Sequence, residues 1–483
     1  MKKSDIGIIG LAVMGENLVL NMESKGYQVS VFNRTFEVTE KFLTGRAKGK
    51  SIQGYKELEE FIDSLASPKK VMMMVKAGKP VDELIDKLLP LLNKDDIIID
   101  GGNSNHEDTT RRVQKVEKDG LYYVGTGISG GEEGALKGPS IMPGGSYQAW
   151  PHLKDIFCDI AAKAPDGSPC CEWIGSEGSG HFVKMVHNGI EYGDMQLISE
   201  AYSLMKNVAG LDNNTMSKIF SEWNDGKLQS YLVEITATIV GYKNSAGEYL
   251  IDKILDTAGQ KGTGKLSVFN AMELGLPLNL ISTAVFERSL SAQKELRVQA
   301  ELLFPRSEES TNKAVIVEID DVRDSLYASK LISYAQGFDL LAKASAQFNW
   351  NLDLSAIAKI WRNGCIIRSN FLNKIAEAYE SNGQLQHLLF APYFKDEIAN
   401  SLEGWKKIAA LAIVEELSIP AFSSALHYFY SLTSGRLPAN ILQAQRDFFG
   451  AHTFERTDKP RGEFFHENWT GEGGDTVSGV YNN

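Results

Sequence analysis

Cysteine is scarce in this sequence, and no pair of cysteines has the spacing of a metal site. The chain has 483 residues and four cysteines: Cys158, Cys170, Cys171 and Cys365. Cys170 and Cys171 are adjacent, so they cannot easily close a long loop. Free thiols in a reducing compartment are therefore expected, rather than a disulfide framework. Because no cysteine–histidine cluster has ligand spacing either, we predict no metal.

Long apolar runs are missing too, which argues against a membrane as partner. The first residues, MKKSDIGIIGLAVM, place two lysines before an apolar run. Asp5 and several glycines interrupt that run, and no small-residue cleavage site follows it, so it does not read as a secretory signal. We therefore expect a cytoplasmic protein.

An excess of positive charge is also missing. The formal net charge is −12, which argues against nucleic acid as a partner. An anionic small ligand then needs a local cluster of lysine and arginine. With 43% hydrophobic and 23% charged residues the composition is that of an ordinary globular protein, and the length predicts two or three domains.

Short apolar runs alternate with helix-like stretches over the first part of the chain. This alternation predicts an α/β fold, with a Rossmann-like, doubly wound and mostly parallel sheet in a domain at residues 1–177. The predicted strands are 5–10, 27–32, 70–75, 96–100 and 121–127. The predicted helices follow the first strand through Met22 and then occupy 81–92 and 105–119.

Residues 178–434 show long patterns with a period of 3.6 residues and few strand signals. They predict a large all-α domain. The predicted helical stretches are 180–209, 214–241, 250–259, 284–299, 323–348, 353–381 and 395–434. Two pairs of segments are weakly similar in sequence: 193–201 with 337–344, and 219–226 with 357–364. This similarity indicates a possible internal duplication.

The C-terminal tail, residues 435–483, has no helical period and contains several glycines. A disordered segment is one interpretation. However, Phe454, Phe464, Phe465 and Trp469 are costly to leave in water. An arm that packs on a neighbouring subunit suits these side chains better.

A glycine turn joins the first predicted strand to its helix. Gly10, Ala12 and Gly15 form the pattern G-x-A-x-x-G, in which glycines allow backbone amides to approach a pyrophosphate at a helix N-terminus. The second strand ends in Asn-Arg-Thr at 33–35, where an NAD-binding domain has an acidic residue for the ribose. Since Arg34 can pair with a 2′-phosphate, we expect the cofactor to be NADP.

One predicted helix has a polar face made of five side chains: Lys184, His187, Asn188, Glu191 and Tyr192. A solvated helix face is one explanation, because charged faces are common. Two glycines on the opposite side, at 189 and 193, indicate instead that another backbone packs there closely and that the helix is buried. On a buried helix a lysine base and a carboxylic acid can act on different carbons of one substrate.

Two glycine-rich segments, 125–135 and 256–265, contain further ligand-binding candidates. The first follows a strand and exposes backbone amides, and the second carries donors suited to a phosphate. The second does not match the P-loop pattern of nucleotide triphosphatases. The candidates in the two segments are Ser129, Gly130, Gly131, Lys261 and Thr263.

A set of motifs occurs in one order between residues 10 and 452: GLAVMG, NRT, VKAG, DGGNS, GISGGEEGA, KMVHNGIEYGDMQ, KGTGKL and AQRDFFGAH. Together they resemble the 6-phosphogluconate dehydrogenases, the decarboxylating enzymes of the pentose phosphate pathway, over nearly the whole chain. The helix motif and GISGGEEGA are specific, whereas the glycine turn is common. Leu266 departs from the family, which usually has an aromatic residue there, and this bears on local packing more than on phosphate binding.

The resemblance implies oxidative decarboxylation of 6-phosphogluconate to ribulose 5-phosphate and carbon dioxide, with reduction of NADP. It implies that Lys184 is the base at the C3 hydroxyl and that Glu191 is the acid that protonates C1. The implied NADP-binding residues are Gly10, Leu11, Ala12, Val13, Met14, Gly15, Asn33, Arg34, Thr35, Val75, Lys76, Ala77 and Asn103. The implied substrate-binding residues are Asn103, Ser129, Gly130, Gly131, His187, Asn188, Tyr192, Lys261, Thr263, Arg288, Arg446 and His452. The last two are implied to come from the tail of a second subunit, so that a homodimer is the active unit.

Two other functions fit parts of the sequence. Another β-hydroxyacid dehydrogenase, such as one acting on 3-hydroxyisobutyrate, shares the style of the motifs. Such chains are much shorter and lack the second helical repeat and the tail. A dinucleotide-binding regulator without catalysis needs neither Lys184 nor Glu191, so the presence of both argues against it.

Overall fold

The computed structural model describes residues 3–260, 262–305, 317–473 and 477–478. The chain forms two compact units, Met1–Ala425 and Leu426–Asn483. The predicted domain limits, after residues 177 and 434, remain a prediction. No helix among the described residues is long and apolar enough to cross a bilayer.

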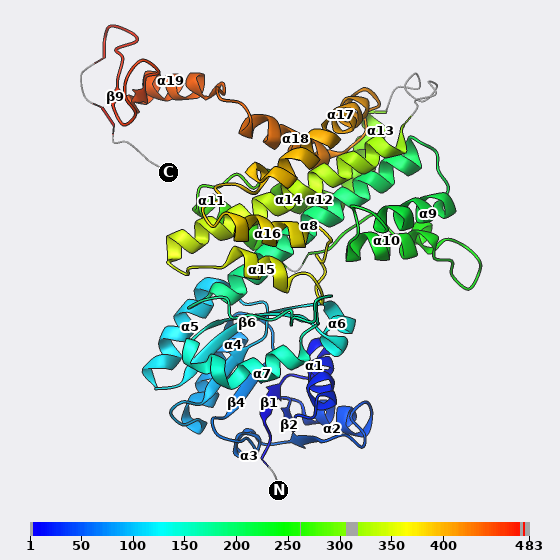
Figure 1. Cartoon of the computed structure of the whole chain (residues 1–483), viewed down its shortest axis with the longest axis vertical. Coiled ribbons are helices and arrows are strands. Elements are labelled where there is room, and N and C mark those ends of the chain that lie inside the picture. Colours follow the sequence, from blue (N-terminus) through cyan, green and yellow to red (C-terminus); the bar gives the residue numbers. More distant parts are fainter. Residues whose placement is uncertain (1–2, 261, 306–316, 474–476, 479–483) are drawn as a thin grey trace. The chain divides into compact units, whose positions relative to one another are not determined.

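A seven-stranded sheet occupies the N-terminal part of the first unit, in blue and cyan in Figure 1. The strand order is β3-β2-β1-β4-β5-β6-β7, with parallel neighbours from β3 to β6 and β7 antiparallel to β6. This order confirms the predicted doubly wound, mostly parallel fold. The strands are β1 (Ile6–Ile9), β2 (Val29–Phe32), β3 (Ile52–Tyr55), β4 (Lys70–Met73), β5 (Ile97–Asp100), β6 (Tyr122–Ser129) and β7 (Ser140–Gly145).

Both faces of the sheet are covered, which explains why its strands are continuous apolar runs. Within β1, Ile8 belongs to the core on one face and Ile9 to the core on the other. Ile99 and Ile98 of β5 divide in the same way. The helices of this part are α1 (Val13–Ser24), α2 (Phe36–Thr44), α3 (Leu58–Asp63), α4 (Lys79–Leu88), α5 (His106–Lys118), α6 (Gly131–Lys137) and α7 (Trp150–Ile160).

A large helical part follows, so the predicted all-α region is confirmed; it lies in the first unit except for the end of its last helix, which belongs to the second unit from Leu426 on. Its helices are α8 (Ser179–Asn207), α9 (Asn213–Asn224), α10 (Tyr231–Gly241), α11 (Thr263–Glu273), α12 (Asn279–Ser291), α13 (Lys294–Leu303), α14 (Ile319–Phe348), α15 (Leu354–Ile360), α16 (Leu372–Ser381), α17 (Pro392–Val414) and α18 (Pro420–Leu432). Short 3₁₀ turns lie at η1 (Leu89–Leu91), η2 (Tyr147–Ala149), η3 (Leu250–Lys253) and η4 (Leu388–Phe390).

Some predicted helical stretches are wrong in detail. The stretch 214–241 forms two helices, α9 and α10. Ser230, at the end of the loop between them, caps α10 by accepting a hydrogen bond from the Val233 amide. The stretch 250–259 holds only the 3₁₀ turn η3 and irregular chain.

Two long helices, α8 and α14, pack side by side through small residues (Figure 1). A Cβ on Gly193 of α8 would lie 2.5 Å from Ser333 Oγ of α14, and a Cβ on Gly337 of α14 would lie 2.5 Å from Ile190 Cδ1. The first pair of weakly similar segments falls on these two helices. The duplication itself remains a prediction.

The second unit has its own structure, which corrects two expectations about the tail. It contains α19 (Ala439–Gly450) and an antiparallel pair, β8 (Phe454–Glu455) and β9 (Phe464–Phe465), where no helix was expected. The fully buried Asp447 carboxylate accepts hydrogen bonds from the Thr453 amide, the Trp469 indole and His466. The described residues of the tail are therefore folded, and the disordered interpretation is wrong for them.

Candidate active site

Helix α8 lies directly against β6 and runs toward the carboxyl end of that strand. A Cβ on Gly180 would lie 2.4 Å from the Gly125 carbonyl oxygen, and a Cβ on Gly127 would lie 2.4 Å from Lys184 Cβ. Only glycine permits this approach, so the glycines of β6 bring the helix onto the sheet. Ligands of open parallel sheets bind beyond the carboxyl ends of the strands, which is where the polar face of α8 arrives.

The polar face of α8 is buried, which excludes a solvated surface helix. The exposed fractions are 7% for Lys184, 0% for His187, 7% for Asn188 and 5% for Tyr192, and the Glu191 side chain is 23% exposed. Polar side chains withdrawn from water in this way need partners or a function.

The opposite side of α8 packs closely against other helices, as its glycines predicted. A Cβ on Gly189 would lie 2.8 Å from Ser267 Oγ of α11, and one on Gly193 would lie 2.8 Å from Leu280 Cδ2 of α12. Ser267 Oγ also donates a hydrogen bond of 2.8 Å to the Met185 carbonyl oxygen. Helices α11 and α12 thus hold α8 in place on the side opposite its polar face.

His187 connects the members of the polar face. Its Nδ1 lies 3.3 Å from Lys184 Nζ, 3.1 Å from Asn188 Oδ1 and 4.0 Å from Glu191 Oε2. Its Nε2 lies 2.9 Å from Ser129 Oγ at the end of β6. The amine and the carboxylate therefore both lie near one imidazole nitrogen.

The surroundings shift the proton affinities of these groups in a useful way. Burial lowers the pKa of the Lys184 amine to about 8, although the Glu191 charge opposes this. Burial raises the pKa of Glu191, against the charges of Lys184 and Arg288. Burial also lowers the pKa of His187 far below its ordinary value, so this ring is neutral. An amine that titrates near neutrality can accept a proton, and a carboxyl with a raised pKa can donate one.

A cationic subsite adjoins the far end of this face. The Arg288 guanidinium lies 3.5 Å from the centre of the Tyr192 ring. A Cβ on Gly264 would lie 2.5 Å from Tyr192 Cδ2, so the first turn of α11, which begins at Thr263, touches the same ring. An arginine and a helix N-terminus on one tyrosine suit a phosphate. The predicted residue Lys261 lies outside the described residues.

The glycine segment after β6 is close to the same face. Ser129 is buried and contacts His187, whereas Gly131 is exposed. Gly130 has a φ of +126°, and a Cβ there would lie 2.8 Å from the Gly364 carbonyl oxygen. The structure thus brings Ser129 together with α8, and Gly130 and Gly131 follow it in the chain.

The turn after β1 fits a dinucleotide. Gly10 has a φ of +103°, and a Cβ there would lie 2.5 Å from the Met74 carbonyl oxygen. A Cβ on Gly15 would lie 2.0 Å from the Gly10 carbonyl oxygen, so neither glycine can be replaced without movement. Ala12 caps α1 without a side-chain hydrogen bond, and Val13 is exposed. The first turn of α1 thus has no side-chain acceptor at its cap, which leaves its amides for an anion.

The end of β2 fits NADP. The Leu11 amide donates a hydrogen bond of 3.2 Å to Asn33 Oδ1, which ties the glycine turn to this strand end. Arg34 and Thr35 follow and are exposed. The guanidinium therefore lies in the segment that distinguishes a 2′-phosphate from a free ribose hydroxyl.

The loops after β4 and β5 open at the same edge of the sheet. The first contains residues 75–77 and the second contains Asn103. Lys76 and Asn103 are exposed, so their side chains can reach a ligand.

Two predicted substrate residues lie in the second unit. Arg446 Nη1 donates a hydrogen bond of 3.1 Å to Gln443 Oε1, and His452 Nδ1 lies 2.8 Å from Ser478 Oγ. Their contribution to the site remains a prediction.

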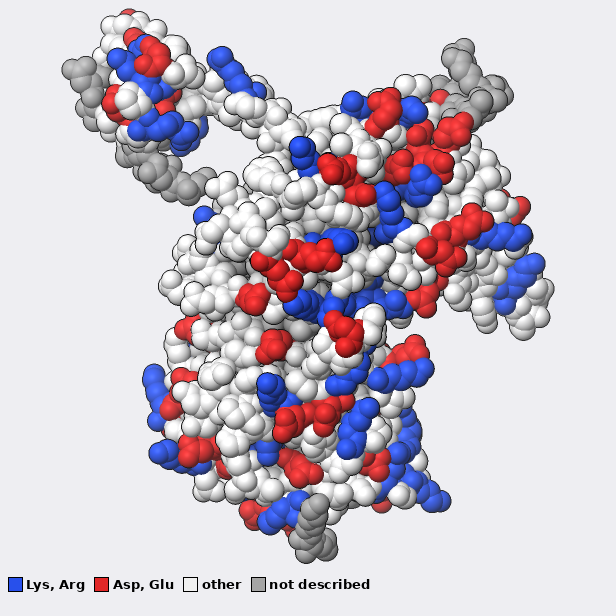
Figure 2. Space-filling view, viewed as in Figure 1, with Lys and Arg blue, Asp and Glu red and all other residues white. Residues whose placement is uncertain are grey.

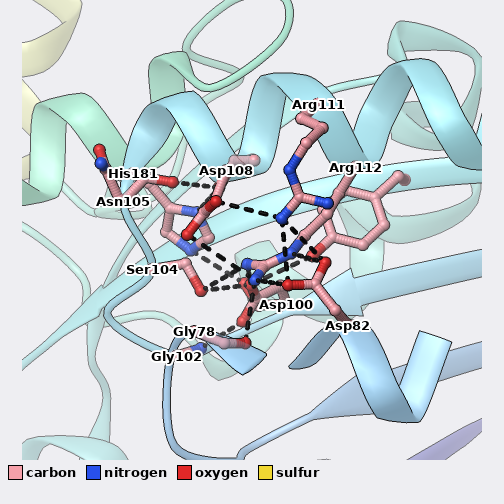
Figure 3. Close-up of polar contacts among 12 residues, drawn as sticks. Gly78, Asp82, Asp100, Gly102, Ser104, Asn105, Asp108, Arg111, Arg112 and His181 are labelled. Carbon is pink, nitrogen blue, oxygen red and sulfur yellow. Dashed lines mark hydrogen bonds and ion pairs between the residues drawn. The ribbon is translucent and has the colours of Figure 1, made fainter. Parts of the chain in front are cut away.

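Sequence reasoning missed a buried polar group around Asp100 and Arg112, drawn in Figure 3. Two signals could have indicated it. Asp100 is a charge at the end of the apolar strand β5, and Arg112 occupies the buried stripe of α5 where an apolar residue is normal.

Charge is dispersed over the face of the first unit that Figure 2 draws. Lysine and arginine alternate there with aspartate and glutamate instead of forming one positive patch. A general positive field on this face is therefore not what would attract a phosphorylated ligand.

Comparisons with known proteins agree with this geometry. Two family models match: the NAD binding domain of 6-phosphogluconate dehydrogenase at residues 5–175, and the 6-phosphogluconate dehydrogenase C-terminal domain at residues 180–469. The chain is 54% identical to the decarboxylating 6-phosphogluconate dehydrogenase of Treponema pallidum over 99% of both chains. It is 52% identical to that of Caenorhabditis elegans over 100% of both. A Plasmodium falciparum 6-phosphogluconate dehydrogenase, studied in its apo form and in complex with NADP+ and with 6-phosphogluconate, is 45% identical and similar with a TM-score of 0.91 over 96% of this chain and 100% of that one.

Proposed function

This chain belongs to the 6-phosphogluconate dehydrogenase family, and from this membership we propose that it converts 6-phosphogluconate to ribulose 5-phosphate and carbon dioxide while reducing NADP. The single feature of the site that carries the proposal is the pair of ionisable groups on α8. Lys184 and Glu191 are withdrawn from water, lie near one neutral imidazole, and have pKa values shifted toward neutrality.

Lys184 acts first, as the base. Its neutral amine takes the proton of the C3 hydroxyl; NADP, when bound at the glycine turn and the end of β2, would supply the acceptor for the hydride from the same carbon. Because Asn188 Oδ1 can only accept, Nδ1 of the neutral His187 ring carries the proton and Nε2 accepts from Ser129 Oγ. The same Nδ1 lies 3.3 Å from Lys184 Nζ, so the ring holds the amine in place. The new ketone is β to the carboxylate, so carbon dioxide can leave while the ketone oxygen takes up the electrons. The Lys184 ammonium stabilises that developing oxyanion.

Glu191 acts second, as the acid. Loss of carbon dioxide leaves an enediol, which needs a proton at C1. Burial raises the pKa of Glu191, which favours the protonated carboxyl that this step requires. Arg288, Tyr192 and the first turn of α11 hold the phosphate end, which fixes the substrate along α8.

The reaction is tested by following absorbance at 340 nm with 6-phosphogluconate and NADP while carbon dioxide is trapped. Equal amounts of reduced cofactor and gas are expected. Reduced cofactor without gas would indicate a simple dehydrogenase of the same superfamily, and neither product would indicate a binding protein.

Arg34 is proposed to select NADP. Arg34→Ala should weaken NADP binding by about 10–100-fold, because a hydrogen bond between charged groups is lost. The NAD affinity of the same variant, which should change little, is the internal control. Equal losses for the two cofactors would contradict the assignment.

We further propose that the second unit serves a partner subunit in a homodimer. Helix α19 exposes a group of large apolar side chains: Ile441, Leu442, Phe448 and Phe449. An apolar face of this kind is typical of an interaction surface, and a second copy of the chain is the partner that the family resemblance implies. Arg446 and His452 would then complete the neighbour's phosphate subsite.

This exchange of tails is testable by complementation. Lys184→Met and Arg446→Ala enzymes should each be nearly inactive alone. Co-expressed, they should regain about a quarter of the wild-type activity, since half the dimers are mixed and one of the two sites in each is intact. No recovery in mixed dimers would mean that Arg446 acts within its own chain or not at all.

The cellular setting is proposed on the same basis. The four cysteines are free, and three of them are buried, as suits a reducing compartment. We place the enzyme in the cytoplasm and its reaction in the pentose phosphate pathway.

A further inference from the structure

A buried carboxylate, Asp100, ends β5 at the edge where the cofactor loops open. It is fully buried, and its Oδ2 accepts a hydrogen bond of 2.6 Å from Ser104 Oγ and one of 3.1 Å from the Tyr123 hydroxyl. Its Oδ1 accepts from the Gly102 amide at 3.0 Å. The carboxylate thus holds the residues on both sides of Asn103, the Gly102 amide and the Ser104 hydroxyl, and Asn103 is a residue we assign to cofactor and substrate.

Arg112 of α5 connects this carboxylate to the neighbouring loop (Figure 3). Its Nη1 lies 3.5 Å from Asp100 Oδ2 and donates to Ser104 Oγ at 3.2 Å. Its Nη2 donates to the Gly78 carbonyl oxygen at 3.0 Å, and Nε and Nη2 bind both carboxylate oxygens of Asp82 at 3.0 Å. One rigid guanidinium therefore spans the loops that follow β4 and β5.

His181 extends the same contacts to α8. Its Nε2 lies 3.1 Å from the Asp100 carbonyl oxygen, and its Nδ1 lies 2.7 Å from Thr109 Oγ1 of α5. Because a carbonyl oxygen can only accept, Nε2 carries the proton. His181 lies one helical turn before Lys184, so the ring joins the strand end to the turn of α8 that carries the base.

The charge of Arg112 is balanced by the neighbouring carboxylates of Asp82 and Asp100. Although burial opposes it, the hydrogen bond from Arg112 to Asp82 and the charges of Tyr123 and Asp100 raise the pKa of the guanidinium. A buried ion pair is seldom the cheapest way to stabilise a core, since apolar residues of the same volume often do as well. Stability alone therefore does not explain this buried ion pair. Both loops that Arg112 contacts lie at the edge of the sheet where we place the ligands.

We propose that Arg112 and Asp100 are positioning residues that hold the cofactor loops 75–78 and 101–104 at a fixed separation from Lys184 on α8. The inference rests on the proposed function, because only a reaction between cofactor and substrate needs that separation. Small misplacements of reacting groups cost much of the rate, so these two residues act on both cofactor affinity and turnover without touching either ligand.

The chain offers a matched control in Arg111. It also binds both oxygens of Asp82 at 3.0 Å, but its side chain is 53% exposed, and its side-chain hydrogen bonds within the described residues go to Asp82 and Asp108. Arg112→Lys and Arg111→Lys keep the charge and alter the same ion pair. The lysine ammonium cannot bridge Gly78 and Ser104 together, so only the first variant loosens the loops.

The test compares these variants by NADP binding, by kcat and by thermal unfolding. We expect Arg112→Lys to raise the Kd for NADP and lower kcat by about tenfold each, and Arg111→Lys to stay within about twofold of wild type. A lower Tm of Arg112→Lys with unchanged Kd and kcat would show a merely structural role and overturn the proposal.

A second pair of variants covers the case in which Arg112→Lys does not fold. Ser104→Ala removes the hydroxyl that joins Asp100 to Arg112, and Ser104→Thr keeps a hydroxyl. The alanine variant should weaken NADP binding and the threonine variant should restore it; equal affinities would overturn the proposal. Wild-type enzyme that neither binds NADP nor turns over would instead refute the proposed function.

Discussion

Two lysines on neighbouring helices are equally buried, yet only one is suited to chemistry. Lys330 of α14 is fully buried, and its Nζ lies 2.5 Å from Asp194 Oδ2 of α8. Lys184 of α8 is 7% exposed, and its nearest polar contact is the neutral ring of His187 at 3.3 Å. Among the described residues it has no ion-pair partner. The comparison shows that a buried amine becomes reactive only where no carboxylate pairs with it.

Removing Lys184 should have the largest effect on activity. Lys184→Met should lower kcat by about 10³-fold or more, because the base is lost. The Tm should stay the same or rise, since an unpaired buried amine is replaced by an apolar side chain. Steady-state kinetics and calorimetry measure the two, with NADP affinity as the control. Retained turnover would remove Lys184 from the mechanism.

Removing Lys330 should affect stability instead. Lys330→Met should lower the free energy of unfolding by about 3–5 kcal/mol, because Asp194 is left buried without its partner. The double variant Lys330→Met/Asp194→Leu removes both charges and should recover most of the loss. Urea unfolding measures both variants. An equal loss in single and double variants would show that the pair is not what holds the two helices.

Glu191 sharpens the comparison, because it lies on α8 between Lys184 and Asp194. Glu191→Gln should lower turnover by about 100-fold, since an amide cannot deliver the proton to C1. The first turnover should still produce a burst of reduced cofactor, which stopped-flow absorbance at 340 nm detects. Loss of the burst along with turnover would place Glu191 in the oxidation step.

The pH dependence should report the unpaired amine. Lys184 acts in its neutral form, which prevails above its pKa of about 8, so activity should rise with pH through this value. Below it, kcat/KM should fall about tenfold per pH unit. A profile of kcat/KM against pH measures this. A rise that begins only near the ordinary pKa of lysine would mean that the amine is paired or solvated.

Local patterns in the sequence were sufficient for the α/β fold, the glycine turn and the polar face of α8. Each of these patterns depends on residues that are close in the sequence, such as Lys184 and Gly189 on the two sides of α8. Two strands were missed for local reasons. β3 is a short edge strand that contains Gly54, and β7 contains Pro143, which normally argues against a strand.

Contacts between distant residues could not be predicted in the same way. The Lys330–Asp194 pair joins positions 136 residues apart, and the Arg112–Gly78 contact joins the start of one helix to the middle of another. Sequence shows that such side chains sit on buried stripes but not which partner meets them. The helix α19 was missed because its exposed apolar residues hide the usual periodicity.

The central claim is tested most directly by measuring the pKa of Lys184 itself. NMR of enzyme with isotopically labelled lysine gives the titration of each amine, and the signal missing from Lys184→Met identifies the one in question. A pKa of about 8 is expected for that signal. A value near 10.5, the ordinary value for lysine, would contradict it.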